Sequence, residues 1–252
     1  MRKLYLAWQD PVERRWYPVG RLTFENNTYK FVYTKGALKA QQSSRFIPFG
    51  RMSDFNVAYE SDELFPLFAN RLLSEKRPEY RSYIKWLKLE NNDHDNRQLA
   101  MLAITGGVRE TDSLEILACP LPTSEGKYEV VFFSHGISHL ERASVEKVNI
   151  LQPGDKLFLM FDIQNPFDPL AIALRSGDPV TIVGYCPRYL TEDFRQILDK
   201  YGPAIPQVKV EQVNLDAPLQ LRLLCRFTSP WPESFQPCSG ELFEPLVRDR
   251  EY

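Results

Sequence analysis

The chain has 252 residues, enough for one large domain or two of ordinary size. Its content of 43% hydrophobic and 25% charged residues is typical of a globular protein that buries a full core. No stretch approaches the ~20 apolar residues that a membrane-spanning helix needs, and the apolar run after the basic N-terminus is too short for a signal peptide. We therefore expect a cytoplasmic protein with no membrane partner.

The net charge of −2 argues against indiscriminate binding to nucleic acid. Residues 1–120 carry 18 Lys and Arg against 15 Asp and Glu, whereas residues 121–252 carry 13 against 18. A nucleic-acid contact in the second part must therefore be local and specific, because no broad basic field supports it.

The sequence offers no recognisable catalytic or metal site. It contains no Gly-rich phosphate loop, no nucleophile elbow and no HExxH motif. The cysteines lack the short paired spacings of a zinc site. We expect no cofactor, no metal and no enzymatic activity, and an enzyme with an unrecognised site stays open as a minor alternative. The four cysteines are Cys119, Cys186, Cys225 and Cys238.

The first 120 residues predict a small α+β domain. Apolar and aromatic runs predict strands over 3–8 and 16–24. After a turn at Asn26-Asn27, alternation of apolar and polar residues predicts a third strand over 29–33. Phe68, Leu72 and Leu73 recur at helical spacing, and further helices are predicted over 80–89 and 95–104. The expected domain therefore combines a strand meander with several helices.

A run of turn formers over 121–127 predicts a domain boundary. Thr191 is expected to cap a helix over 192–201. Many strands with one late helix predict a small β-barrel or sandwich over 121–230, followed by a Pro-rich tail over 231–252 that wraps a surface or stays mobile. The expected fold class is α+β. Strands are predicted over 128–134, 155–162, 171–174, 180–185, 208–213 and 219–227.

The segment Asn165-Pro166-Phe167-Asp168-Pro169 predicts a rigid turn. Its prolines fix φ, and the Asn and Asp side chains can bond back to the backbone. Such a turn holds an apolar ring and a carboxylate outside a strand end. The residues alone leave open a second interpretation, in which the loop is only stiff and Phe167 fills the barrel mouth.

Four motifs follow one another around this turn. They are Gly136-Ile137-Ser138-His139, Pro153-Gly154-Asp155, the Asn165–Asp168 loop, and Gly184-Tyr185-Cys186-Pro187-Arg188. In this order and spacing, residues from about 128 to 230 resemble the HIRAN family.

The resemblance implies an OB-like barrel that captures single-stranded DNA at its 3′ end. Phe167 is then expected to stack on the terminal base, Asp168 to bond to the sugar hydroxyl, and Asn165 to support the loop. Ser138 and His139 replace an Arg-Tyr pair of the eukaryotic domains, which implies weaker phosphate binding. The expected DNA-binding set is completed by Tyr185 and Arg188, which could compensate.

Residues 1–115 resemble, more loosely, the N-terminal subdomain of HipA-type toxin kinases. The resemblance rests on Val19-Gly20-Arg21-Leu22, the strand from Tyr29 to Tyr33, and Leu64-Phe65-Pro66-Leu67-Phe68. An unrelated small α+β domain is the other interpretation. The leading hypothesis is a two-domain, non-catalytic protein that binds single-stranded DNA or a 3′ end. The alternative is an antitoxin-like module that acts on a HipA-type kinase partner.

Overall fold

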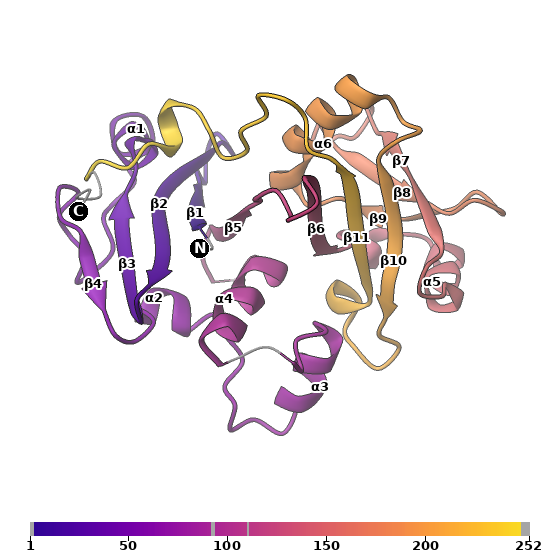
Figure 1. The fold of residues 1–252 in the computed structure, drawn as a ribbon, viewed down its shortest axis with the longest axis horizontal. Coiled ribbons are helices and arrows are strands. Elements are labelled where there is room, and N and C mark those ends of the chain that lie inside the picture. The colour runs from indigo at the N-terminus through magenta and orange to yellow at the C-terminus, as the bar shows by residue number, and fades with distance from the viewer. Residues whose placement is uncertain (1–2, 92–93, 110, 248–252) are drawn as a thin grey trace. The chain divides into compact units, whose positions relative to one another are not determined.

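The computed structural model describes residues 3–91, 94–109 and 111–247, which form two compact units (Figure 1). Unit 1 comprises Met1–Arg77, Asn91–Cys119 and Gln236–Tyr252, and unit 2 comprises Pro78–Glu90 and Pro120–Phe235. The α+β fold class is confirmed. None of the described helices is long and apolar enough to cross a membrane. A division at residues 121–127 stays a prediction, but the contacts place Pro78–Glu90 with the second unit.

Unit 1 is built on an antiparallel five-stranded sheet in the order β4-β3-β2-β1-β5. Its strands are β1 (Lys3–Gln9), β2 (Trp16–Glu25), β3 (Thr28–Tyr33), β4 (Tyr59–Ser61) and β5 (Leu114–Cys119). Its helices are α1 (Lys35–Ser44), α2 (Pro66–Ala69) and α4 (His94–Thr105), and it contains the 3-10 turn η3 (Glu241–Phe243). The expected meander over the first three strands is confirmed.

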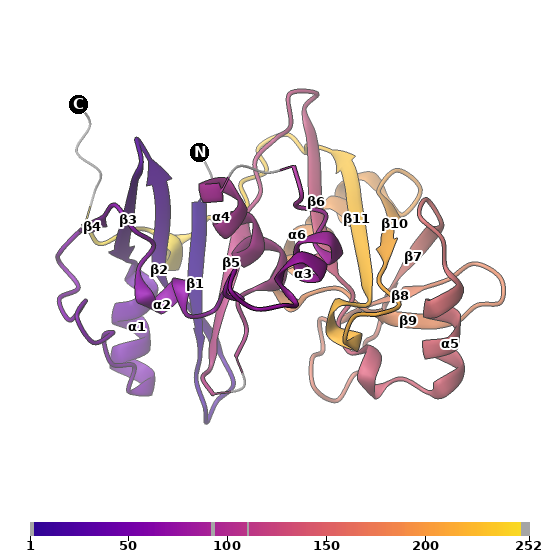
Figure 2. The same cartoon turned by 90° about the horizontal axis from the view of Figure 1, so that it is seen from below.

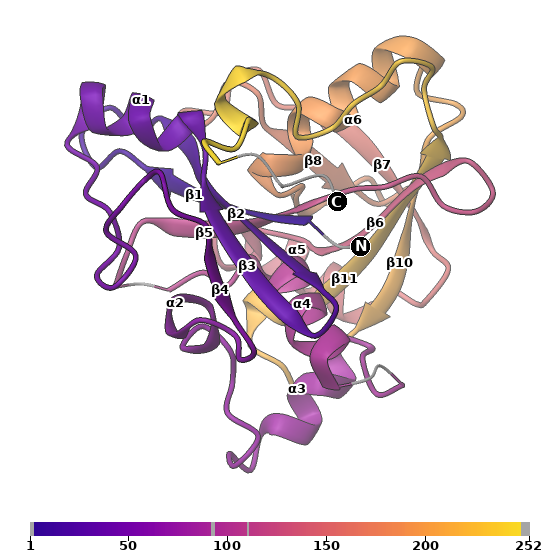
Figure 3. The ribbon, with the colours of Figure 1, turned by 60° about the vertical axis from the view of Figure 1, so that its left-hand side comes forward.

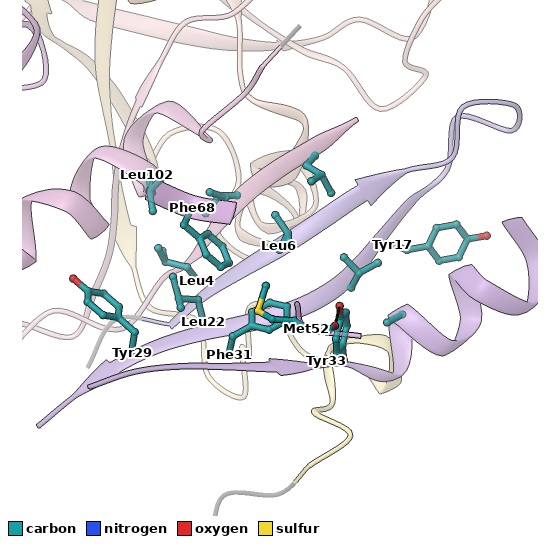
Figure 4. Packing of buried hydrophobic residues seen from close by; sticks show 14 of the residues in the cluster. Leu4, Leu6, Tyr17, Leu22, Tyr29, Phe31, Tyr33, Met52, Phe68 and Leu102 are labelled. Carbon is teal, nitrogen blue, oxygen red and sulfur yellow. Dashed lines mark hydrogen bonds between the residues drawn. The ribbon is translucent and has the colours of Figure 1, made fainter. Parts of the chain in front are cut away.

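The core of unit 1 forms where apolar side chains of this sheet meet the helices (Figure 4). Leu4 and Leu6 of β1 lie beside Leu22 of β2 and Phe31 of β3, and Phe68 of α2 packs against the ring of Phe31. Because side chains alternate across a strand, Leu4 and Leu6 face this core, whereas Tyr5 lies on the opposite face, where it packs against Phe243.

The last part of the chain completes unit 1. The Leu246 N–H donates to the carbonyl oxygen of Tyr33 at 2.8 Å, and the Lys35 N–H donates to Glu244 at 2.8 Å. The ring of Phe243 meets Tyr5 edge-on, with ring centroids 5.0 Å apart. Figure 3 shows η3 in yellow beside α1, with which it is in contact. The segment over 236–247 is therefore a structural part of unit 1.

Unit 2 is built on a six-stranded antiparallel sheet in the order β6-β11-β10-β7-β8-β9. Just after β6, His135 pairs with Tyr185 at the end of β9, so the two edges of the sheet approach each other and the sheet curls into a half-barrel. Its strands are β6 (Lys127–Phe133), β7 (Lys156–Phe161), β8 (Ile172–Arg175), β9 (Ile182–Tyr185), β10 (Gln207–Val213) and β11 (Leu223–Pro230).

The helix α6 (Arg188–Tyr201) closes the core of this half-barrel. Its apolar stripe buries Phe194, whose ring stacks on Phe227 of β11 at 4.0 Å. The predicted cap at Thr191 is wrong: the helix begins at Arg188 after Pro187, and the buried Thr191 hydroxyl donates to the Arg188 carbonyl at 2.7 Å.

The expected late helix of this part is confirmed in α6, and other helices accompany it. Unit 2 contains α5 (Arg142–Ile150), which lies beside β9 (Figure 2), and α3 (Tyr80–Trp86). The Trp86 indole donates to Asp216 at 3.0 Å, and Lys88 pairs with Glu211 at 2.6 Å. These contacts attach α3 to the end of β10. The unit also contains the 3-10 turns η1 (Ile137–His139) and η2 (Leu219–Leu221).

A half-buried carboxyl on α6 makes the stability of unit 2 depend on pH. Asp193 accepts a hydrogen bond from the Tyr128 hydroxyl at 2.8 Å, and burial raises the pKa of Asp193 to about 6. The folded state therefore binds the proton of Asp193 more tightly than the unfolded chain does. The contribution of Asp193 to the free energy of unfolding is largest below about pH 4 and is lost as the pH rises through about 6. The loss amounts to up to about 3 kcal/mol.

Asp193→Asn keeps an acceptor for Tyr128 and removes the charge. We expect its free energy of unfolding to exceed that of the wild type at pH 7 and to approach it at about pH 4, as measured by urea unfolding at both values. Asp199→Asn, on the exposed side of the same helix, is the control. An equal gain in both variants at pH 7 would contradict the prediction.

Candidate nucleic-acid interface

The loop between β7 and β8 is shaped by the side chain of Asn165. Its Oδ1 accepts the backbone N–H groups of Phe167 at 3.0 Å and of Asp168 at 3.1 Å. This turn fixes the backbone on both sides of the phenylalanine. Phe167 is 88% exposed. It therefore does not fill the barrel mouth, and its ring is presented to solvent.

A second set of hydrogen bonds ties the loop to β9. Asp162 Oδ2 accepts from the Asn165 amide at 3.1 Å and from the Tyr185 hydroxyl at 3.0 Å. Burial, and then the hydrogen bond to the Asp162 carboxylate, raises the pKa of Tyr185, so this hydroxyl stays protonated and donates. The loop is held at its base through a carboxylate shared by two donors.

The other end of the loop is fixed by an ion pair with α6. Arg188 Nε lies 2.8 Å from Asp168 Oδ2, and another guanidinium nitrogen donates to the Phe167 carbonyl at 2.8 Å. Asp168 Oδ1 accepts the Leu170 N–H at 3.0 Å. The Arg188 side chain is 40% exposed, so a cation lies at the surface beside the exposed ring.

Gly184 positions Tyr185 relative to the segment after β6. Its φ of +128° lies in a region that residues with a side chain rarely adopt, and a Cβ added there would lie 1.9 Å from Ser134 Oγ. This close approach allows the paired backbone hydrogen bonds between His135 and Tyr185, both 2.9 Å. The adjoining turn η1 carries Ser138 and His139, both exposed to solvent.

The structure brings together five of the seven predicted site residues. Hydrogen bonds to the loop or within it link Asn165, Phe167, Asp168, Tyr185 and Arg188, whereas Ser138 and His139 lie on a separate turn next to β9.

Three side chains of this region were missed by sequence reasoning. Asp162 connects the loop to Tyr185, and Ile163 and Leu170 are 77% and 46% exposed. Asp162 stands directly after an apolar strand, which is a position where a polar side chain could have been noticed. The two exposed apolar residues lie in the same loop as Phe167, between β7 and β8.

Among the described residues, no group of three or more His, Cys, Asp or Glu side chains could hold a metal ion. What the loop offers is an exposed aromatic face, an adjacent guanidinium, and a carboxylate paired with that guanidinium. These groups bind bases, phosphates and hydroxyls, and they include no nucleophile paired with a base.

Comparison with known proteins identifies the second unit. Residues 127–231 match the family model of the HIRAN domain. These residues form a HIRAN domain. The match leaves more than half of the chain outside the domain.

Two solved structures are similar to part of the chain. One is a protein from Lactobacillus plantarum, with 17% identity over 41% of this chain and 96% of that one, at a TM-score of 0.31. The other is the HIRAN domain of human HLTF, with 14% identity over 42% of this chain and 80% of that one, at a TM-score of 0.30.

No curated protein matches the chain. Nothing in these comparisons identifies the N-terminal region as HipA-like, so that resemblance stays a prediction.

Proposed function

We propose that this protein is a non-catalytic DNA-binding protein whose HIRAN domain takes single-stranded DNA, or a 3′ DNA end, at the Asn165–Asp168 loop. The observation that carries the proposal is Phe167, which is 88% exposed on a turn fixed by two hydrogen bonds to Asn165. Exposing a large apolar ring on a rigid support costs free energy unless a ligand covers it. A base can cover it, because every base has a flat apolar face.

The neighbouring groups suit the other parts of a terminal nucleotide. Arg188 places a cation beside the ring, where a phosphate would lie. Asp168 is the acceptor that we propose for the terminal sugar hydroxyl. Both of its oxygens already receive one hydrogen bond, from Arg188 and from the Leu170 N–H, and each retains a further lone pair.

Phe167→Ala tests the stacking role. Stacking of one base on an aromatic ring contributes ~1–3 kcal/mol, so the variant should bind a short single strand about 10- to 100-fold more weakly. The measurement is fluorescence anisotropy with a short labelled oligonucleotide. The wild type should also prefer a free 3′-hydroxyl over a 3′-phosphate, because a phosphate adds charge next to Asp168 and removes the donor.

Val180→Ala provides the matched control, because Val180 is also a largely exposed apolar residue of the HIRAN domain but lies outside the loop between β7 and β8. It should bind nearly as well as the wild type. Equal affinity for free and blocked 3′ ends would remove the end-recognition part of the proposal. No binding to any single strand would refute the proposal and favour a protein-interaction module.

A further inference from the structure

The outer face of the HIRAN sheet carries a row of cations that crosses four strands. In the register of the sheet, Lys156 of β7 lies directly opposite Lys209 of β10, and Lys209 lies directly opposite Arg226 of β11. Residues opposite one another in a sheet project from the same face. Their neighbours Leu157 and Val208 point into the core, so the three cations face solvent.

The row continues onto β8 through an aromatic ring. Phe158 follows Lys156 by two residues and therefore lies on the same face. Its register partner on β8 is Arg175. The Arg175 guanidinium lies 4.6 Å from the centre of the Phe158 ring, and Lys156 Nζ lies 5.2 Å from it. We call Arg175, Phe158, Lys156, Lys209 and Arg226 the basic band.

The charges of the band are only partly compensated. Arg226 pairs with Glu211 and Glu129. No carboxylate of the described residues forms an ion pair with Lys156 or Lys209, and both are exposed. Like charges directly opposite each other destabilise a sheet. The repulsion between Lys156 and Lys209 therefore destabilises the sheet. An anion bound between the two ammonium groups would reduce this repulsion.

We propose that the basic band is a second DNA contact, which binds the phosphate backbone of the strand whose end lies at Phe167. This inference rests on the proposed function. Strand β7 connects the two places, because it begins at Lys156 and ends at Phe161, directly before the loop with Asp162 and Asn165. At ~3.3 Å per residue the strand is about 17 Å long, a span of a few nucleotides. A phosphate chain matches a row of separate cations, and a base can lie against Phe158.

The test compares a short and a long single strand in the double variant Lys156→Gln, Lys209→Gln. Oligothymidines of about 4 and about 16 nucleotides are titrated at several salt concentrations. Each phosphate contact on a single strand contributes about −0.7 to the slope of log K against log salt, so the long strand should lose about 1.4 from its slope. The affinity of the variant for the long strand should fall about tenfold at low salt. The short strand should bind the variant and the wild type equally well.

The control is the double variant Arg142→Gln, Lys200→Gln, which removes two exposed cations from α5 and α6. It should leave the slope for the long strand unchanged. An equal loss of slope in the control, or none in the Lys156 and Lys209 variant, overturns the basic band as a contact. The urea midpoint of the Lys156→Gln, Lys209→Gln variant should stay the same or rise, because a pair of like charges is removed. A lower midpoint would show that the two lysines stabilise the fold, and it would contradict the inference.

The outcome separates the two proposals. If the basic band does not contact DNA, the short strand still binds, and Phe167→Ala still weakens that binding. Failure of the proposed function leaves the short strand unbound in every variant. Binding of a polyglutamate peptide as tight as that of the long oligonucleotide would overturn the assignment of the band to nucleic acid.

Discussion

Gly184→Ala is expected to destabilise the HIRAN domain by about 3 kcal/mol or more, a large part of the roughly 5–15 kcal/mol that a typical domain has. Two costs add. The φ of +128° at this residue is strained for any residue with a Cβ, at ~1–3 kcal/mol. The added methyl would also lie 1.9 Å from Ser134 Oγ and 2.8 Å from the His135 carbonyl, and such overpacking costs a further ~1–3 kcal/mol.

The residues around the added methyl cannot move away without losing hydrogen bonds. Ser134 is buried and its hydroxyl donates to the Val183 carbonyl, and the His135 carbonyl accepts from the Tyr185 N–H. Moving either group breaks the link that curls the sheet and positions Tyr185. The variant should therefore lose the proposed DNA binding along with stability.

Gly154→Ala is the control for backbone strain alone. Gly154 has φ of +95°, and a Cβ added there would meet no atom within 4 Å, so the substitution should cost only the strain. Urea unfolding of both variants gives the comparison. Equal losses in the two would show that the close contact at Ser134 contributes nothing.

Local chemistry made the shape of the Asn165–Asp168 loop predictable from sequence. Asn165 forms its turn with residues two and three positions away, and the two prolines act on their own backbone. The ion pair of Asp168 with Arg188 spans twenty residues and depends on where α6 begins. Sequence reasoning began that helix too late, because Thr191 is a good capping residue in isolation, whereas the fold uses it inside the helix.

The strands were predicted better than the assembly of the units. Short apolar runs or alternating apolar residues mark the single strands, and Tyr29 to Tyr33 is an example of alternation. No local signal shows that α3 packs on the end of β10 or that Leu246 pairs with β3, because these contacts join residues more than a hundred positions apart. The basic band was missed because Lys156 and Lys209 are far apart in the sequence and become neighbours only through the register of the sheet.

Ending the chain after Phe235 should destabilise unit 1 by about 3–5 kcal/mol and leave the HIRAN domain folded. The deletion removes the hydrogen bond from Leu246 to Tyr33 and that from Lys35 to Glu244, each worth ~0.5–1.5 kcal/mol. It also uncovers the apolar surface that Phe243 and Leu246 bury, a further ~2 kcal/mol.

A chain that ends after Val247 keeps each of these contacts and is the matched control for the deletion. Hydrogen exchange of the Tyr33 and Leu6 amides reports on unit 1, and anisotropy with a short single strand reports on the HIRAN domain. Exchange should accelerate by about two to four decades only in the chain that ends after Phe235, because ~1.4 kcal/mol corresponds to a factor of about ten. Binding should be the same in both chains, because the residues that form hydrogen bonds with the Asn165–Asp168 loop all precede Phe235. Unchanged exchange in the shorter chain would show that the segment after Phe235 only covers unit 1 and does not hold it together.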